Sequence, residues 1–206
     1  MLKVGLTGSI AVGKTFVCQV LAELGCYVLD ADQTAREVVM PNTPGWNKVL
    51  EAFGQEVFQP NGELDREKLG SIVFSDGEKR TLLNSIIHPL VFEKQNEWVI
   101  QKESEDPNGI AIIDAALMIE SGGYRRYDKL IVVWCQPEIQ IERLIKRNYL
   151  SREEAEKRIA TQMPQEEKKS YADYLIDTSA GFETTRKQTE AVHGQLRELT
   201  SQTALR

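Results

Sequence analysis

Short apolar runs alternate along the chain with longer stretches in which apolar and charged positions recur at helical spacing. The runs cover residues 3–7, 27–30, 110–114, 129–135 and 174–177. They lack strict alternation, which is typical of strands covered on both faces in a parallel sheet. The helical stretches cover residues 14–24, 32–39, 45–53, 66–74, 77–104, 137–148, 151–161 and 182–200. This order predicts an α/β fold with a doubly wound, five-stranded parallel sheet.

The spacing of the predicted strands is uneven. Far more chain separates the second strand from the third than one crossover requires, and that interval is mostly helical. We interpret residues 41–107 as a helical insertion over the carboxyl ends of the strands, where open α/β sheets bind ligands. Residues 137–171 are helical and rich in lysine and arginine, which indicates a mobile lid over phosphates. Interspersed glutamates leave a solvated helical pair as the alternative. Residues 1–40, 108–136 and 172–206 then form the core of a single domain, 1–206.

Residues 8–15 read Gly-Ser-Ile-Ala-Val-Gly-Lys-Thr and fit the phosphate-binding pattern G-x-x-x-x-G-K-[ST]. They stand between a predicted strand and a predicted helix, which is the context that this motif needs. Gly8 and Gly13 allow a backbone course that a Cβ would obstruct. Lys14 brings a positive charge to the β- and γ-phosphates, and Thr15 offers a hydroxyl to Mg²⁺. Backbone N–H groups are expected to wrap the phosphates at Ala11, Val12, Gly13, Lys14, Thr15 and Phe16.

The second predicted strand ends in Asp30-Ala31-Asp32. Because alternate residues of an extended segment project to the same side, we expect both carboxylates to face one space beside the phosphate loop. A carboxylate there can accept a proton from an attacking hydroxyl or hold a metal-bound water. The alternative is structural, with Asp32 capping the next helix and Asp30 in a turn. Arg36, one helical turn after Asp32, either pairs with it or binds an anionic substrate.

The predicted helix 137–148 has a polar face that carries Gln140, Arg143 and Arg147. An arginine that converges on a transferred phosphoryl group stabilises its charge, and Arg143 is the candidate for that role. An ordinary wet helix face is the alternative reading of these residues.

Two further polar residues are candidates. Asp114 ends the third predicted strand, where it either holds a water on Mg²⁺ or caps the strand end. His88 precedes Pro89, which we expect to restrict His88 to an extended conformation. A lone histidine is more often structural than part of an acceptor pocket, and both readings stay open here.

Composition removes several classes of protein. The formal net charge of −6 argues against binding nucleic acid through a broad basic surface. The apolar runs are too short to span a membrane, and the chain enters its first strand without a basic leader. With two histidines and three cysteines that lack C-x-x-C spacing, a zinc site has too few ligands. The cysteines are expected to be buried free thiols, which indicates a cytoplasmic protein.

Together these motifs resemble the dephospho-coenzyme A kinase family from residue 3 to residue 190. Asp30-Ala31-Asp32, His88-Pro89 and Gln162-Met163-Pro164 are more specific in combination than the glycine loop, which many kinases share. The chain departs from the family pattern at Ala116 and Ile119, where the family usually has proline and phenylalanine, and in a loop poorer in glycine than usual, with Ser9, Ala11 and Val12 inside it. The other matching segments are Leu24-Gly25, Ala35-Arg36, Leu64-Asp65-Arg66, Val73-Phe74-Ser75-Asp76, Pro137-Glu138, Gln140, Glu142-Arg143, Arg147, Arg158-Ile159, Ala172-Asp173 and Ile176-Asp177.

The resemblance implies ATP-dependent phosphorylation of the ribose 3′-hydroxyl of dephospho-coenzyme A, with Mg²⁺ as cofactor. It places the catalytic base at Asp32 and a phosphoryl-stabilising arginine at Arg143, with Lys14 as the third catalytic residue. Gly8 and Arg147 join the loop residues as ATP-binding candidates. The acceptor-binding candidates are Asp30, Arg36, His88 and Asp114. We expect a monomer or weak homo-oligomer that binds no nucleic acid and no membrane.

Two rival functions stay open at this point. One is another kinase of the same architecture, acting on a nucleoside, a nucleotide or a shikimate-type acceptor. The other is a nucleotide-binding scaffold without catalysis, which the presence of Lys14, Thr15, Asp30 and Asp32 together disfavours.

Overall fold

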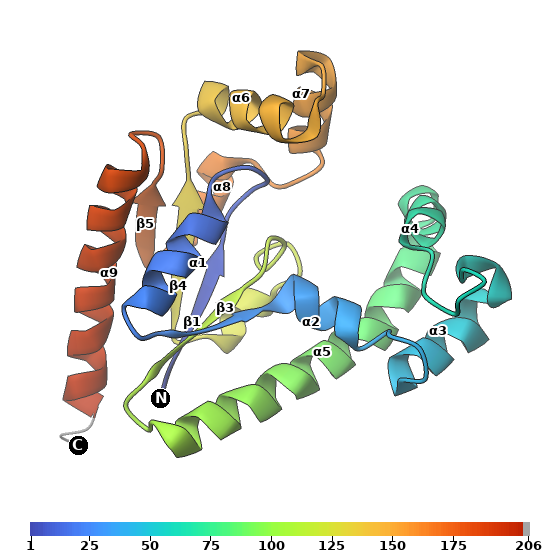
Figure 1. Ribbon diagram of the computed structural model, residues 1–206, viewed down its shortest axis with the longest axis horizontal. Coiled ribbons are helices and arrows are strands. Elements are labelled where there is room, and N and C mark those ends of the chain that lie inside the picture. Colours follow the sequence, from blue (N-terminus) through green and yellow to red (C-terminus); the bar gives the residue numbers. More distant parts are fainter. Residues whose placement is uncertain (204–206) are drawn as a thin grey trace. The chain divides into compact units, whose positions relative to one another are not determined.

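Five parallel strands form one sheet in the order β2-β3-β1-β4-β5 (Figure 1). The computed structural model describes residues 1–203. In the pairing register, Leu6 of β1 and Asp30 of β2 both lie opposite Asp114 of β3. Three strands therefore end side by side at one edge of the sheet, the edge from which the glycine-rich loop also departs. The strands are β1 (Leu2–Thr7), β2 (Tyr27–Asp30), β3 (Ile110–Asp114), β4 (Lys129–Trp134) and β5 (Tyr174–Asp177).

The sheet belongs to a compact unit made of Met1–Asp30 and Gln101–Arg206, of which residues up to 203 are described. Helices α1 and α9 pack against one face of the sheet (Figure 1). Val17 and Leu21 of α1 and Leu196 of α9 belong to one buried cluster with side chains of β1 and β3. All of these side chains are buried, so this layer is the main hydrophobic core. The helices of this unit are α1 (Lys14–Glu23), η2 (Gly123–Arg126), α6 (Pro137–Asn148), α7 (Arg152–Ala160), α8 (Gln165–Lys169) and α9 (Phe182–Thr203).

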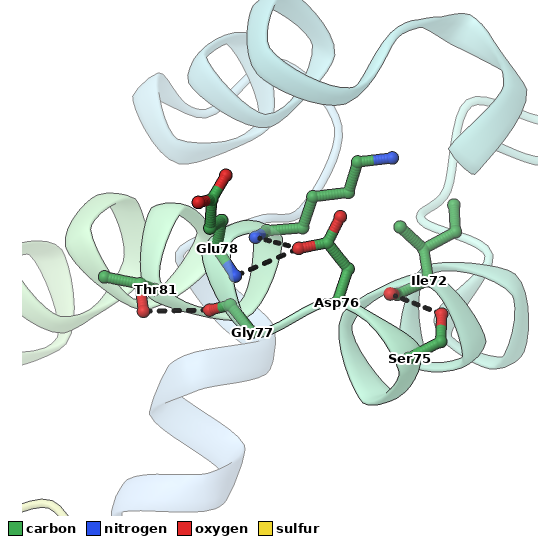
Figure 2. A pocket seen from close by; sticks show the side chains of 7 residues that line it. Ile72, Ser75, Asp76, Gly77, Glu78 and Thr81 are labelled. Atoms are coloured by element: carbon green, nitrogen blue, oxygen red, sulfur yellow. Dashed lines mark hydrogen bonds between the residues drawn. The ribbon is translucent and has the colours of Figure 1, made fainter.

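The second compact unit, Ala31–Ile100, is helical and has its own core. That core includes Val38 and Val39, just after α2, and Phe53 of α3. The Asp76 carboxylate accepts hydrogen bonds from the Glu78 and Lys79 N–H groups and so caps the long helix α5 (Figure 2). The elements are α2 (Ala31–Glu37), α3 (Pro44–Phe53), η1 (Gln55–Val57), α4 (Arg66–Ser75) and α5 (Gly77–Glu105), whose last turns belong to the first unit.

The five predicted strands and the α/β class are confirmed. Helix α8 was not predicted, because it is short and polar and has no apolar periodicity. The expected insertion began at residue 41, whereas the helical unit begins at Ala31, since Val38 and Val39 pack into its core. Within the described residues, no helix is both long enough and apolar enough to span a membrane.

The predicted conformation of His88 is wrong. Helix α5 continues through Pro89, so His88 is helical rather than extended. The preference of a residue before proline for extended backbone is a local steric effect. It is overridden here by packing of the helix, in which Ile86, Ile87 and Leu90 contact the core of the helical unit.

We expect Leu196→Ala to lower the free energy of unfolding by about 2–5 kcal/mol, because the side chain is fully buried between α9 and the sheet. Urea denaturation followed by circular dichroism measures this loss. Ile100→Ala is the control, since Ile100 is 66% exposed and its truncation should cost no more than about 0.5 kcal/mol. Equal losses in the two variants would show that α9 is not part of the main core.

Candidate functional site

The loop formed by residues 8–15 leaves β1 and enters α1 with an unusual backbone. Ala11 and Gly13 have positive φ angles of 62° and 92°. A Cβ on Gly8 would collide with the carbonyl oxygen of Val133 in β4, so only glycine fits there. Successive N–H groups in such a turn form a concave nest that binds anions.

The amide hydrogens of this loop divide into two groups. Val12 N–H donates to the Ser9 carbonyl at 3.4 Å, and Phe16 N–H donates to the Gly13 carbonyl at 3.2 Å. Among the described residues, no acceptor pairs with the N–H groups of Ala11, Gly13, Lys14 and Thr15. These unpaired donors differ from the predicted set, because the Val12 and Phe16 amides are already used within the loop. The Ser9 hydroxyl is also buried without a partner in the described part of the chain.

Two glutamine side chains, one on α6 and one just after α7, form hydrogen bonds with the loop backbone. Ile10 N–H donates to Gln162 Oε1 at 2.8 Å, and Ile10 O accepts from Gln140 Nε2 at 2.7 Å. Gln140 in turn accepts from Gln165 Nε2 at 2.7 Å, and Gln165 Oε1 accepts from the Cys135 N–H. This chain of amides fixes the outer turn of the loop through both polar groups of one residue. Gln140, which the sequence places on the polar face of its helix, is buried, and these bonds satisfy its amide group.

The inner turn of the loop is held from β5. The Val12 carbonyl accepts from Thr178 Oγ1 at 2.7 Å and, at 3.5 Å, from Arg143 Nη1. Arg143 Nη1 also donates to Thr178 Oγ1 and Nη2 to the Thr178 carbonyl, both at 2.8 Å. Arg143 therefore lies beside the loop and braces it against the segment after β5. The resemblance implied a role at the transferring phosphoryl group, and here its donors are aimed at Thr178.

A charged pair lies at the carboxyl edge of the sheet, under the loop. Lys14 Nζ is 2.5 Å from Asp114 Oδ1, and the two side chains are only 16% and 15% exposed. Burial, together with the Asp114 and Asp30 charges, raises the pKa of the Cys18 thiol far above its usual range. The ion pair gives Lys14 a carboxylate partner in this structure, and Asp114 holds the lysine close to the unpaired N–H groups of the loop.

Hard oxygen donors suited to Mg²⁺ occur at the same edge. They are the Thr15 hydroxyl, which is exposed at the start of α1, and the carboxylates of Asp30 and Asp114. The described residues contain no cluster of three or more histidine, cysteine, aspartate or glutamate side chains suited to hold a metal. This donor set fits a magnesium ion that keeps most of its ligands from water and phosphate oxygens.

A cavity of about 300 Å³ opens beside the loop. Its walls include Gly13, Phe16, Arg143, Thr178 and Phe182. The Phe16 and Phe182 rings lie 4.8 Å apart between centroids, and Phe182 is 76% exposed. The combination of aromatic faces, a guanidinium and threonine hydroxyls suits a planar heterocycle.

Asp32 and Arg36 lie in the helical unit, on α2. The expectation that Asp30 and Asp32 project alike from an extended segment is wrong, because α2 begins at Ala31. Asp32 is exposed in the first turn of that helix, and Arg36 is exposed in its last turn. The helix begins earlier than the strand pattern indicated because Ala31 and Thr34 are buried one turn apart.

Two other candidates, His88 and Arg147, lie on α5 and α6. His88 stacks on Phe92 within α5, with 5.8 Å between ring centroids. Arg147 is exposed near the end of α6, and its Nε donates to Asn148.

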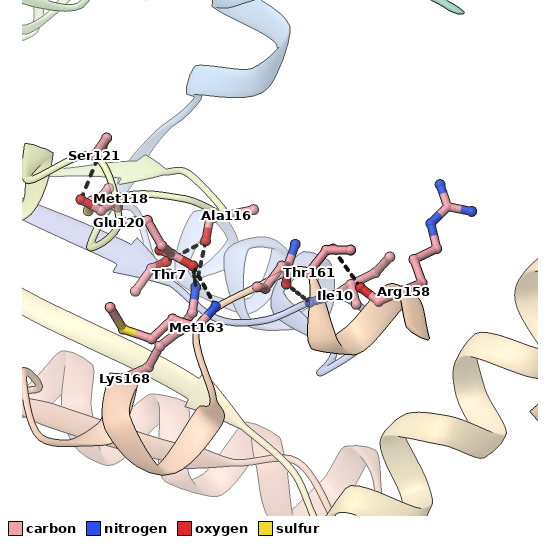
Figure 3. Close-up of polar contacts among 11 residues, drawn as sticks. Thr7, Ile10, Ala116, Met118, Glu120, Ser121, Arg158, Thr161, Met163 and Lys168 are labelled. Carbon is pink, nitrogen blue, oxygen red and sulfur yellow. Dashed lines mark hydrogen bonds and ion pairs between the residues drawn. The ribbon is translucent and has the colours of Figure 1, made fainter. Parts of the chain in front are cut away.

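A buried lysine that the sequence analysis did not single out connects the loop after β3 to α8. Lys168 Nζ donates to the Ala116 carbonyl at 2.9 Å and pairs with Glu120 Oε1 at 2.8 Å (Figure 3). Glu120 also accepts from the Met163 N–H, and Thr7 Oγ1 donates to the same Ala116 carbonyl. A lysine in a charged helical stretch reads as a surface residue, so no local signal distinguished Lys168 from its exposed neighbours.

Comparisons with known proteins give one family. A model described as dephospho-CoA kinase matches residues 2–184. A dephospho-CoA kinase of Bacillus anthracis is 47% identical over 191 residues, covering 92% of this chain and 94% of that protein. A solved dephospho-CoA kinase from Campylobacter jejuni is 27% identical with a TM-score of 0.71, covering 95% of this chain and 97% of that one. A solved protein from Thermus thermophilus is 29% identical with a TM-score of 0.80, at the same coverage.

We expect all three thiols to resist alkylation in the native protein at pH 8. Burial raises the pKa of Cys26 to about 12 and also raises that of Cys135, as it does for Cys18. An unfolded thiol ionises near pH ~8.5, so ionisation favours the unfolded chain as pH rises above that value. Iodoacetamide labelling followed by mass spectrometry should be at least about ten times faster in guanidinium than in buffer. Equal rates would contradict the burial.

Proposed function

This chain belongs to the dephospho-CoA kinase family, and we propose that residues 8–15 hold the phosphates of ATP while the ribose 3′-hydroxyl of dephospho-CoA attacks the γ-phosphorus. The transfer yields coenzyme A and ADP. The observation that carries this proposal is the set of unpaired loop N–H groups at Ala11, Gly13, Lys14 and Thr15. Donors that are fixed before the ligand arrives stabilise phosphate charge without the cost of reorganisation.

Lys14 supplies the mobile charge in this proposal. In the structure it pairs with Asp114, and the two groups are mostly shielded from water. Phosphate oxygens compete for the same ammonium group, so Lys14 moves from the carboxylate toward the β- and γ-phosphates when nucleotide binds. Asp114 keeps the ammonium group within reach until then.

In this proposal the Thr15 hydroxyl would hold the magnesium ion, and the Asp114 and Asp30 carboxylates would supply further oxygen acceptors at the same edge of the sheet. The ion, when bound, neutralises charge on the β- and γ-phosphates. The donor set supports this assignment because all of the groups are hard oxygens.

Asp32 orients the 3′-hydroxyl and accepts its proton. The Asp32 side chain is exposed to solvent in the first turn of α2 and also interacts within the protein. In a loose transition state the proton leaves late, so aiming the oxygen contributes more than basicity. Arg143 adds positive charge beside the loop, and its bonds to Thr178 keep the guanidinium in place.

We assign the adenine ring to the cavity next to Gly13. The walls of this cavity include the aromatic side chains of Phe16 and Phe182, whose rings contact each other, and the guanidinium of Arg143. His88 remains a candidate for binding the acceptor, and Arg147 remains a candidate for binding ATP. Only the resemblance to the family supports these two assignments. We further propose a cytoplasmic enzyme that acts as a monomer or weak homo-oligomer and binds no nucleic acid; the free thiols agree with a reducing compartment.

Lys14→Met should abolish the rise in melting temperature that Mg·ATP causes in the unaltered protein, because the phosphates lose their only side-chain charge from the loop. Differential scanning fluorimetry with and without Mg·ATP measures the effect. Lys187→Met, on the exposed face of α9, is the matched control and should keep the full shift. A normal shift in Lys14→Met would argue against the assigned nucleotide position.

Asp32→Asn should lower kcat for dephospho-CoA by about 10²–10⁴-fold and leave the Kd for ATP unchanged, since the base is lost and the phosphate cradle is intact. Coupled ADP release and product mass give the rate and the product. Asp32→Ala should fall further, because asparagine can still accept a hydrogen bond from the hydroxyl.

Glu67→Gln is the control for Asp32, since Glu67 occupies the same first-turn position on α4 of the helical unit. Near-normal transfer by Asp32→Asn would disprove the base assignment. Acceptor-independent ADP release alone would favour a nucleotide-binding protein without this kinase activity.

A further inference from the structure

Residues 162–168 connect the phosphate loop to the loop after β3, which covers residues 115–122 (Figure 3). Ile10 N–H donates to Gln162 Oε1 at 2.8 Å. The N–H of the next residue, Met163, donates to Glu120 Oε1 at 3.3 Å. One short segment therefore contacts both of these loops at the carboxyl edge of the sheet.

The Ala116 carbonyl is the second point at which this segment meets the loop after β3. It accepts a hydrogen bond from Lys168 Nζ at 2.9 Å and another from Thr7 Oγ1, at the end of β1, at 3.2 Å. Ala115 N–H donates to a carbonyl of β1 at 3.0 Å. The two residues that follow Asp114 are therefore both bound, the first to the backbone of β1 and the second to two side chains.

A lysine at position 168 is an expensive choice for stability. The residue is fully buried, and its partner Glu120 is only 24% exposed in its side chain. An ion pair removed from water often stabilises a protein less than packed apolar side chains of the same volume. If packing were the only requirement, an apolar side chain of similar length would serve better. The ammonium group differs from such a side chain in its three N–H donors, and these bind the loop after β3.

We propose that Lys168 is a positioning residue for phosphoryl transfer. By binding the Ala116 carbonyl it fixes the loop after β3, and with that loop the carboxylate of Asp114. This role rests on the proposed function, in which Lys14 leaves Asp114 for the phosphates of ATP. Asp114 lies only two residues before Ala116, so movement of the loop displaces the carboxylate and its lysine partner. A misplacement of about 1 Å costs about 10²-fold in rate when the affected groups act on the reaction.

The first test is Lys168→Met, which keeps the approximate length of the side chain and removes its donors. We expect kcat with dephospho-CoA to fall about 10- to 100-fold and the KM for dephospho-CoA to stay unchanged. Rates are measured at a temperature where circular dichroism shows every variant to be folded. Hydrogen exchange followed by mass spectrometry gives a readout that needs no activity, and peptides covering residues 114–122 should exchange faster in the variant.

A double variant separates positioning from stability. Lys168→Met alone leaves the Glu120 carboxylate without its ammonium partner and should lower the melting temperature by about 5–15 °C. Adding Glu120→Gln removes the second charge and still lets the side chain accept from the Met163 N–H, so most of the melting temperature should return. We expect kcat to stay low in the double variant, because the Ala116 carbonyl still lacks its donor. Recovery of kcat together with stability would overturn the proposal.

Lys169→Met is the matched control, since Lys169 is the next residue on α8 and its ammonium group pairs with Glu166 of the same helix. It should keep normal kcat and normal exchange. If Lys168→Met fails to fold, Thr7→Val replaces it, because it removes the other donor to the Ala116 carbonyl and leaves both charges in place. That variant should lower kcat by about 2- to 10-fold, as expected for one neutral hydrogen bond.

Unchanged kcat or unchanged exchange in the variant that is used contradicts the role of Lys168. If the unaltered protein does not phosphorylate dephospho-CoA, the proposed function itself is wrong.

Discussion

Hydrogen bonds from side chains of other elements fix the backbone of the phosphate loop and so allow some of its N–H groups to stay unpaired. Ile10 gives both its N–H and its carbonyl to glutamine side chains, and the Val12 carbonyl is bound by Thr178. Among the described residues, the N–H groups of Ala11, Gly13, Lys14 and Thr15 have no acceptor. A left-handed alanine is unfavourable by about 1–2 kcal/mol, and the bonds on either side of Ala11 hold it in that conformation.

The same requirement explains the buried polar contacts that the segment from α6 to α8 makes with the phosphate loop and the loop after β3. Gln140 lies on α6, Gln162 follows α7, and Gln165 and Lys168 lie on α8. Much of the positive charge in this segment is neutralised locally, since Arg152 pairs with Glu138 and Lys168 with Glu120. Gln140 and Gln165 each use both polar atoms of their side-chain amides, and a buried network paired in this way stabilises one arrangement.

The two units carry different sets of charged residues. In the sheet unit, carboxylates at the strand ends hold a lysine near main-chain donors. In the helical unit, α2 carries a carboxylate in its first turn and an arginine in its last. This division suits a reaction in which one substrate brings a triphosphate and the other brings a hydroxyl.

Local patterns in the sequence were enough to predict the five strands, most helices and the phosphate loop. Each of these depends on residues close together in the chain, such as the glycines and lysine of residues 8–15 between two apolar runs. The resemblance to the kinase family was carried by ordered motifs and is confirmed by the family match. Local steric preference was misleading at His88, where core packing keeps the helix continuous through Pro89.

Contacts between distant residues were decided by the tertiary structure alone. The hydrogen bonds of Gln140 and Gln162 to Ile10 and the burial of Lys168 bring together residues from separate elements, and each looks like a surface side chain in its own helix. Periodicity reports which face of a helix is apolar, whereas the pairing of buried polar groups depends on which segments the fold places side by side.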